Sequence, residues 1–232
     1  MRRGRMATGV KRIRMARPKL TTKDKLMDAA ERLFARHGFH GTSLREITGA
    51  ARVDLALVNY HFGNKKQLLA AVVERRGHVL NEERLRRLNE VRLAAAPEPP
   101  STEEVIGAFF DPILERLAHA GAGWHSYFAL LAYVNNSPEW GSKLMGKTFD
   151  STVREFIRAM MASLPKAAPE DIFWGYNFLT GALTLSLAET GRLDVLSDGL
   201  CRSTDVPALQ ARLGPYVAAG LRGLAQRGSR AR

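Results

Sequence analysis

The chain has 232 residues, of which 45% are hydrophobic, and a formal net charge of +12 at pH 7. This apolar content supports a buried core, and no apolar run approaches the roughly 20 residues of a membrane span, so we expect a globular, cytoplasmic protein without a membrane segment. The single cysteine, Cys201, excludes an internal disulfide and a cysteine-based metal site.

The first 20 residues form a basic arm that we expect to be disordered. Residues 1–19 carry eight Lys and Arg and no acidic residue, whereas residues 77–232 carry equal numbers of both signs. The whole positive excess therefore lies in the first third of the chain, as expected when only this part meets a polyanion such as DNA. A solvated basic face without a partner, or a start of translation at Met6 or Met15, is the alternative explanation.

A first short helix is predicted from the spacing of apolar residues after Thr21. Between Leu26 and Phe34 they recur at offsets of three, four, seven and eight, which places them on one helical face. Thr21 with Asp24 forms the N-terminal cap, and Gly38 ends the helix. The segment is therefore an amphipathic helix with one buried side.

Three further helix starts follow closely. Ser43 and Glu46 have the spacing of a capping box, which opens a second helix. After a turn of a few residues, Asp54 caps a third helix at 55–62, and Asn64 starts a long charged helix that runs to about residue 93. Two helices joined by such a turn, with another packed behind them, form a helix-turn-helix.

The rest of the chain is predicted to be a helical bundle. Prolines between residues 94 and 101 break the helical pattern. Further helices are expected at about 103–118, 123–136, 138–163, 169–190 and 205–226. No segment shows the alternation of a strand. The fold class is therefore all-α, with a helix-turn-helix domain over residues 21–70 and a helical domain over residues 71–228.

Three stretches near the N-terminus carry a family resemblance. They are AAERLFARHGFHGTS at 29–43, TSLREI at 42–47 and VDLALVNYHFGNKKQLL at 53–69. Together they resemble the DNA-binding domain of the tetracycline-repressor (TetR) family over about residues 22–70, and the Tyr-His-Phe-Gly-x-Lys block is a strong marker of that family. One position departs from the family, which usually has Ala-Gly-Val where this chain has Ala51-Arg52-Val53.

The resemblance implies a set of residues that contact operator DNA. We expect Leu55, Ala56 and Asn59 to face the major groove, where apolar groups meet thymine methyls and asparagine bonds adenine. Arg45 is expected to reach a guanine or a phosphate. Hydroxyl, imidazole and ammonium donors suit phosphate contacts, which fix the register without reading sequence. These donors are Thr42, Tyr60, His61 and Lys65.

One such domain covers too few base pairs for selective binding, so we expect a homodimer on an inverted repeat of double-stranded DNA. The helices at 169–190 and 205–226 carry small residues among large apolar ones, which suits close helix packing. We therefore place the dimer interface on these two helices, with a seam inside one protomer as the alternative.

Aromatic residues in the C-terminal domain are candidates for an effector pocket, since ligand sites are mostly apolar. The candidates are Phe109, Trp124, Phe128, Phe149, Phe156 and Phe178. Each is also a candidate for plain core. The form DLALVNYHFGNK is similar to a subgroup that includes regulators of fatty-acid metabolism, which implies a small hydrophobic effector such as a fatty acid or an acyl-CoA.

The sequence thus predicts a ligand-responsive transcriptional repressor that a small apolar effector releases from its operator. It lacks the GxSxG, HExxH, P-loop and CxxC motifs, so we expect neither an enzyme nor a cofactor or metal site. The alternative is a helical DNA-binding structural or interaction protein with no effector.

Overall fold

A computed structural model describes residues 20–119 and 121–230. Its elements, in chain order, are α1 Thr22–His37, α2 Leu44–Ala51, α3 Ala56–Phe62, α4 Lys65–Ala95, α5 Thr102–His119, α6 Ala122–Asn135, η1 Gly141–Met145, α7 Gly146–Ser163, α8 Pro169–Leu187, α9 Arg192–Leu196 and α10 Val206–Arg230. The element η1 is a short π-helical segment, and the described residues contain no strand. The all-α prediction is therefore confirmed, while residues 1–19 of the predicted arm lie outside the described residues.

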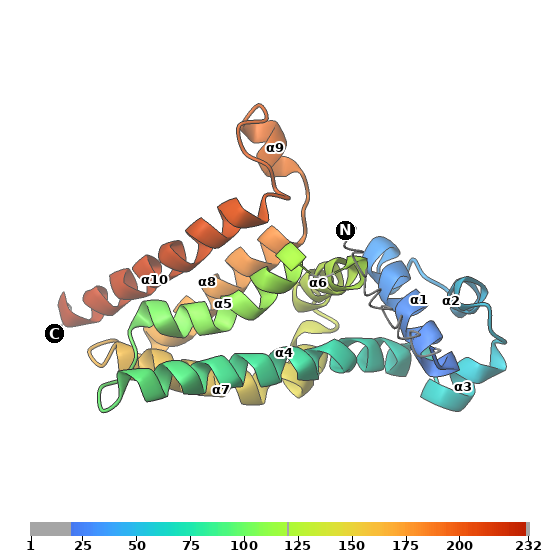
Figure 1. Cartoon of the computed structure of the whole chain (residues 1–232), viewed down its shortest axis with the longest axis horizontal. Coiled ribbons are helices and arrows are strands. Elements are labelled where there is room, and N and C mark those ends of the chain that lie inside the picture. Colours follow the sequence, from blue (N-terminus) through green and yellow to red (C-terminus); the bar gives the residue numbers. More distant parts are fainter. Residues whose placement is uncertain (1–19, 120, 231–232) are drawn as a thin grey trace, which may run out of the picture.

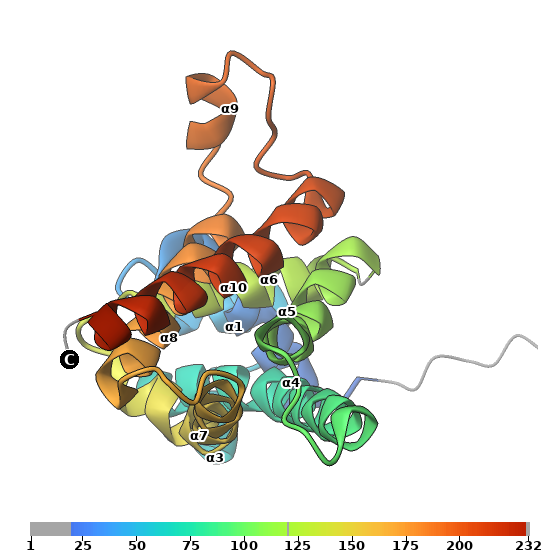
Figure 2. The ribbon, with the colours of Figure 1, turned by 90° about the vertical axis from the view of Figure 1, so that its left-hand side faces the viewer.

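The molecule consists of a head, α1 to α3, and a body, α4 to α10 (Figure 1). The long helix α4 starts beside the head and continues along the whole body, where α5 and α7 pack against it. Helices α8 and α10 pack on each other on the opposite side, and α9 projects away from the body on a pair of extended segments (Figures 1 and 2). The domain boundary expected after residue 70 falls inside α4.

Side-chain caps fix the starts of the head helices where the sequence predicts them. The Thr21 hydroxyl accepts a hydrogen bond from the Asp24 N–H at 3.1 Å, and Ser43 accepts one from the Glu46 N–H at 3.2 Å. The Asn64 side chain accepts one from the third residue of α4 at 3.0 Å. Each cap satisfies an N–H that has no partner inside its helix. Local sequence therefore determines where α1, α2 and α4 begin.

The single helix expected at 138–163 is interrupted in the structure. The chain turns after α6, forms η1, and continues as α7. Trp140 is buried against Phe39 of the head, with 4.8 Å between ring centroids. Gly141 allows the turn, because a Cβ there would lie 2.9 Å from the Asn135 carbonyl oxygen. A contact with a distant part of the chain thus overrides the local helical pattern.

One continuous hydrophobic core joins the head to the body. It includes Phe34 of α1, Leu69 of α4, Phe128 of α6 and Phe156 of α7, all buried. Because α1 packs on both α4 and α6, the orientation of the head depends on the packing of the body. Within the described residues, no helix combines the length and the apolar character needed to cross a membrane.

Candidate nucleic-acid interface

Helices α2 and α3 lie at the outer end of the head and are joined by a short turn (Figure 1). Arg52, in that turn, has φ 56° and ψ 50°, which is the left-handed conformation. This conformation destabilises a residue with a Cβ by roughly 1–2 kcal/mol, whereas glycine adopts it with almost no strain. The turn therefore has the geometry that glycine favours, and Arg52 adopts it at some cost in stability.

The outward face of α3 carries the side chains that the sequence predicts for DNA contact. Val58 and Phe62 point into the core of the head. Leu55, Ala56 and Asn59 are exposed, and Tyr60 is 81% exposed. Large apolar and aromatic groups in water lose the free energy that burial would provide. This face is therefore available to a partner rather than used by the fold.

The acidic residues beside α3 are engaged in caps. The Asp54 carboxylate accepts a hydrogen bond from the Ala56 N–H at 2.7 Å. The Glu46 carboxylate accepts one from the Ser43 N–H at 2.6 Å, and this hydrogen bond lowers the pKa of Glu46. Arg45 and Arg52 are exposed, and the described residues offer neither of them a carboxylate partner. Their positive charge thus stays available near the exposed face.

Lys65 and His61 flank this face and are half-buried. The Lys65 ammonium lies 4.3 Å from the centroid of the Phe39 ring, at the first residue of α4. The His61 ring lies between those of Tyr60 and Phe62, at centroid distances of 4.9 and 6.1 Å. Both side chains therefore have packing partners inside the head and keep one side open to solvent.

Thr42 is buried, although the sequence predicts it on the surface that contacts DNA. Its side chain is only 2% exposed, and its hydroxyl donates to the carbonyl oxygens of Leu33 and Gly38, at 3.1 and 2.9 Å. The expected phosphate contact through this hydroxyl is therefore a mistake, because the hydroxyl closes the end of α1 instead. Arg45, three residues further on, stays exposed at the start of α2.

The six aromatic residues proposed for an effector pocket do not form one group. Phe109 and Phe156 meet edge to face at 5.0 Å in the body, and Trp124 meets Phe128 at 5.5 Å near the head. Phe149 is buried in α7. Phe178 lies outside all of these contacts, because its side chain is 57% exposed on α8 and stacks on Trp174. The interior set is thus divided, and Phe178 belongs to an outer surface.

A buried group of ion pairs, here called the ionic joint, connects head and body and is not predicted from the sequence. Glu31 of α1 is 1% exposed and accepts hydrogen bonds from Arg75 at 3.1 Å and from Arg76 at 2.8 and 3.1 Å. Arg76 also lies over the Trp124 ring, at 4.9 Å. Glu31 falls in the apolar stripe of α1, and a charged residue in such a stripe is a sequence signal for a buried ion pair. The joint connects α1, α4 and α6.

Both the N-terminal and the C-terminal part of the chain match known protein families. Residues 26–72 match the model described as "Bacterial regulatory proteins, tetR family", and residues 107–220 match "Tetracyclin repressor-like, C-terminal domain". The probable HTH-type transcriptional regulator YttP of Bacillus subtilis is 44% identical over 55 residues, which are 24% of this chain and 27% of YttP. The HTH-type transcriptional repressor SCO4008 of Streptomyces coelicolor is 38% identical over 61 residues, 26% of this chain and 32% of that relative. The chain thus matches about a third or less of the length of these curated relatives.

Solved structures show the same fold over most of the chain. The fatty acid degradation regulator FadR from Bacillus halodurans aligns with a TM-score of 0.62 and 18% identity, over 89% of this chain and 99% of FadR. Mycobacterium smegmatis AmtR aligns with a TM-score of 0.53 and 19% identity, over 88% of each chain. At such low identity the likeness concerns the arrangement of the helices.

Proposed function

The chain belongs to the tetracycline-repressor family of regulatory proteins, and we propose that it is a transcriptional repressor that binds operator DNA as a homodimer and leaves it when a small apolar effector binds. The observation that carries this proposal is the exposed face of α3. Leu55, Asn59 and Tyr60 are exposed, and the cations Arg45 of α2 and Arg52 of the connecting turn are exposed as well. This combination suits a helix that enters the major groove beside two phosphate backbones.

Side-chain chemistry assigns each group a part in DNA binding. Asn59 is suited to a bidentate contact with adenine, and Leu55 and Ala56 to contacts with thymine methyls. Tyr60 and His61 at the end of α3, and Lys65 at the start of α4, carry donors for phosphate oxygens. Arg45 reaches the groove or the backbone from α2. Thr42 no longer belongs to this set, because its hydroxyl is buried.

The outer faces of α8 and α10 support the proposed homodimer. On α8, Phe173, Trp174 and Phe178 are exposed, and the last two stack at 5.8 Å. Gly175 lies in the seam inside the protomer, where a Cβ would collide with Leu221. Four other glycines of these two helices are open, since a Cβ added to any of them meets no atom within 4 Å; they are Gly181, Gly214, Gly220 and Gly223. An apolar face with small residues suits the close approach of a second copy.

The projecting segment around α9 extends this apolar surface. Exposed leucines at 193, 196 and 200 face a cavity of about 530 Å³ between the end of α8, α9 and the start of α10. Leu185 of α8 also lines the cavity, so the cavity is continuous with the proposed interface. We place a second copy of the chain over this segment, because contact with water alone leaves its leucines without burial.

Effector release is proposed to act through α4, which begins beside the head and runs the length of the body. DNA binding requires the two α3 helices to be one DNA turn apart, roughly 34–36 Å, and an effector that binds better to a body with α4 displaced changes this spacing. The free energy of DNA binding is then reduced by the difference in effector binding free energy between the two states, typically about 1–3 kcal/mol. The FadR likeness agrees with a fatty acid or an acyl-CoA as the apolar effector.

The tight packing of Phe109, Phe128 and Phe156 favours a second candidate function, a DNA-binding protein with no effector. Both candidates share the α3 interface. They differ in whether any small molecule changes DNA retention.

Replacing Tyr60 and Lys65 together by alanine tests the DNA-binding part. We expect retention on a promoter fragment to weaken about 30-fold or more, because the dimer loses four phosphate contacts and each is worth at least roughly 0.5 kcal/mol, the low end for a hydrogen bond. The slope of log affinity against log salt should also fall by about 2 for a dimer, one for each lost lysine. Binding is measured by fluorescence anisotropy over a range of salt concentrations.

Lys166→Ala provides the matched control, since Lys166 is exposed in the loop between α7 and α8, at the end of the body away from the head (Figure 1). It should leave both affinity and salt slope unchanged. A double variant that stays folded and binds like the unmodified protein would remove α3 as the DNA-binding element.

A further inference from the structure

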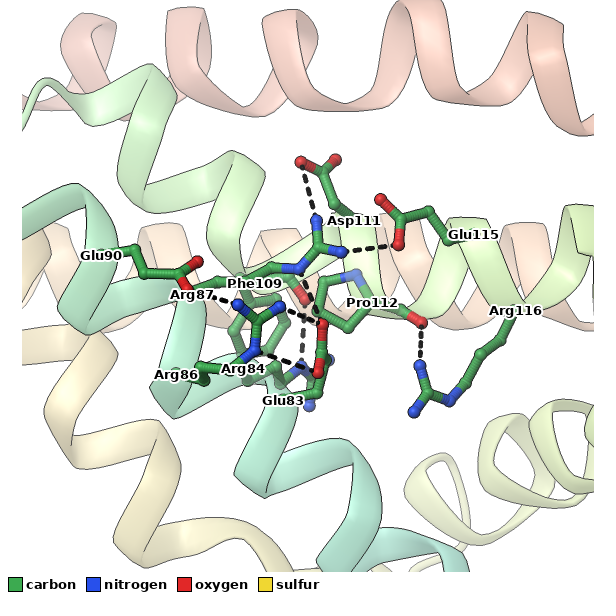
Figure 3. Close-up of polar contacts among 10 residues, drawn as sticks. All are labelled: Glu83, Arg84, Arg86, Arg87, Glu90, Phe109, Asp111, Pro112, Glu115 and Arg116. Carbon is green, nitrogen blue, oxygen red and sulfur yellow. Dashed lines mark hydrogen bonds and ion pairs between the residues drawn. The ribbon is translucent and has the colours of Figure 1, made fainter.

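Arg84 of α4 is a buried cation whose charge no side chain of the described protein neutralises. It is 5% exposed, and no carboxylate of the described residues pairs with it. Its neighbours differ, as Figure 3 shows: Arg86 contacts Glu83 and Glu90, and Arg87 contacts Glu83, Asp111 and Glu115. The contact drawn for Arg84 is with the carbonyl oxygen of Phe109, to which its Nε donates at 3.0 Å.

An aromatic ring lies against this guanidinium, and further rings pack on that ring. Its central carbon lies 3.8 Å from the centroid of the Phe109 ring, and Phe156 and Tyr176 meet the same ring edge to face at 5.0 and 6.3 Å. Burial lowers the pKa of Arg84 to about 10, so the group still carries its proton at neutral pH. The interior of the body therefore holds one uncompensated positive charge within an apolar setting.

Further polar atoms without partners lie near this charge. Asn81, one turn before Arg84 on α4, donates from its Nδ2 to the Thr148 carbonyl oxygen at 2.7 Å. Its Oδ1 and the Thr148 hydroxyl are both buried without a hydrogen-bond partner in the described structure. The hydroxyl of Tyr176, which is half-buried on α8, makes no hydrogen bond to the described residues. Buried polar groups are almost always satisfied, so two unsatisfied ones close to an unpaired cation indicate a missing hydrogen-bonding group.

We propose that Arg84, with the Tyr176 and Thr148 hydroxyls, binds the carboxylate of an apolar organic acid in the interior of the body. A carboxylate supplies a negative charge that matches the fork of the Arg84 guanidinium, and acceptor lone pairs for the Thr148 and Tyr176 hydroxyls. Asn81 Oδ1 is itself an acceptor and gains no partner from a carboxylate. The apolar part of the acid packs among Phe109, Phe156 and Tyr176, whose rings repack around it.

This inference rests on the proposed effector control and narrows the effector to a free acid. The thioester end of an acyl-CoA carries no charge, so an acyl chain that enters the interior as a thioester would leave Arg84 without a carboxylate. The acid would also join α4 to α5 and α8, because Arg84, Phe109 and Tyr176 come from these three helices. Occupation of the site therefore acts on the helix that carries the head.

Calorimetry with the full chain and no DNA tests the site. The probes are octanoate, dodecanoate and benzoate, each compared with the alcohol of the same carbon skeleton, and dodecanoyl-CoA. At least one acid should bind more than about tenfold tighter than its alcohol and than the thioester, as expected for a charge-assisted bidentate pair. Arg84→Met should bind that acid and its alcohol equally. Tyr176→Phe should weaken acid binding and leave the alcohol unchanged, which keeps the test decisive if Arg84→Met does not fold.

Arg87→Met is the matched control, because Arg87 already has carboxylate partners, and it should keep the preference for the acid. The proposal is overturned if no acid is preferred over its alcohol, or if both Arg84→Met and Tyr176→Phe keep the full preference. DNA retention of unliganded Arg84→Met should equal that of the unmodified protein. If neither the unmodified chain nor any variant binds DNA, that result counts against the proposed function and not against the acid site.

Discussion

Replacing Trp174 and Phe178 together by aspartate is expected to convert the dimer into a monomer and to weaken operator binding by about 100-fold or more. The two rings are 59% and 57% exposed and stack on each other on α8. Charges at the centre of an apolar interface must lose their hydration when the second copy binds. Without the dimer, each α3 binds alone, and the gain in affinity from linking two half-sites is lost.

Sedimentation analysis and DNA anisotropy check this result together. Leu93→Asp is the control, since Leu93 is also an exposed apolar residue but lies near the end of α4. That variant should remain a dimer and bind DNA normally. A double variant that sediments as a dimer would place the interface elsewhere on the molecule, whatever its affinity for DNA.

The second large effect concerns the joint between head and body. Glu31→Ala should lower the free energy of unfolding by about 3 kcal/mol, because removing one partner of a buried ion pair leaves the other charges uncompensated. Glu31 receives hydrogen bonds from both Arg75 and Arg76, of which Arg75 keeps a second partner, Asp28, at 2.8 Å. Urea unfolding followed by circular dichroism gives the free energy and its slope.

Glu82→Ala serves as the reference, because Glu82 is exposed on α4 and should change the free energy by less than about 0.5 kcal/mol. If Glu31→Ala proves as mild as this reference, the ionic joint does not hold the head in place, and the apolar contacts of α1 with α4 and α6 carry that role alone.

The starts of α1, α2 and α4 were the most predictable part of the fold. Caps at Thr21, Ser43 and Asn64 depend on side chains and N–H groups three residues apart, so the local sequence contains the whole signal. The exposed face of α3 was predictable for the same reason, since Val58 and Phe62 define the buried side by their spacing. The five-residue α9 was missed because so short a helix has no measurable periodicity.

Residues whose environment depends on distant contacts were not predictable in this way. Thr42 has the chemistry of a phosphate ligand, and only the folded chain shows its hydroxyl bonded to Leu33 and Gly38. Glu31 and Arg84 look like ordinary surface charges in charged helices. Their positions give a usable signal, however, because Arg84 falls midway between the buried Leu80 and Leu88 on one face of α4. A charge in an apolar stripe marks a buried partner or a buried site.

Selection from random-sequence duplexes by the full-length protein, in the presence of competitor DNA, measures directly whether two copies of α3 read DNA. We expect enrichment of an inverted repeat whose half-site centres lie about one helical turn, roughly 34–36 Å, or a multiple of it apart. Asn59→Ala should relax the preference at one base pair in each half-site and leave the salt dependence unchanged. A retained pool without any sequence preference, or one that Asn59→Ala leaves identical at every position, would contradict sequence reading by α3.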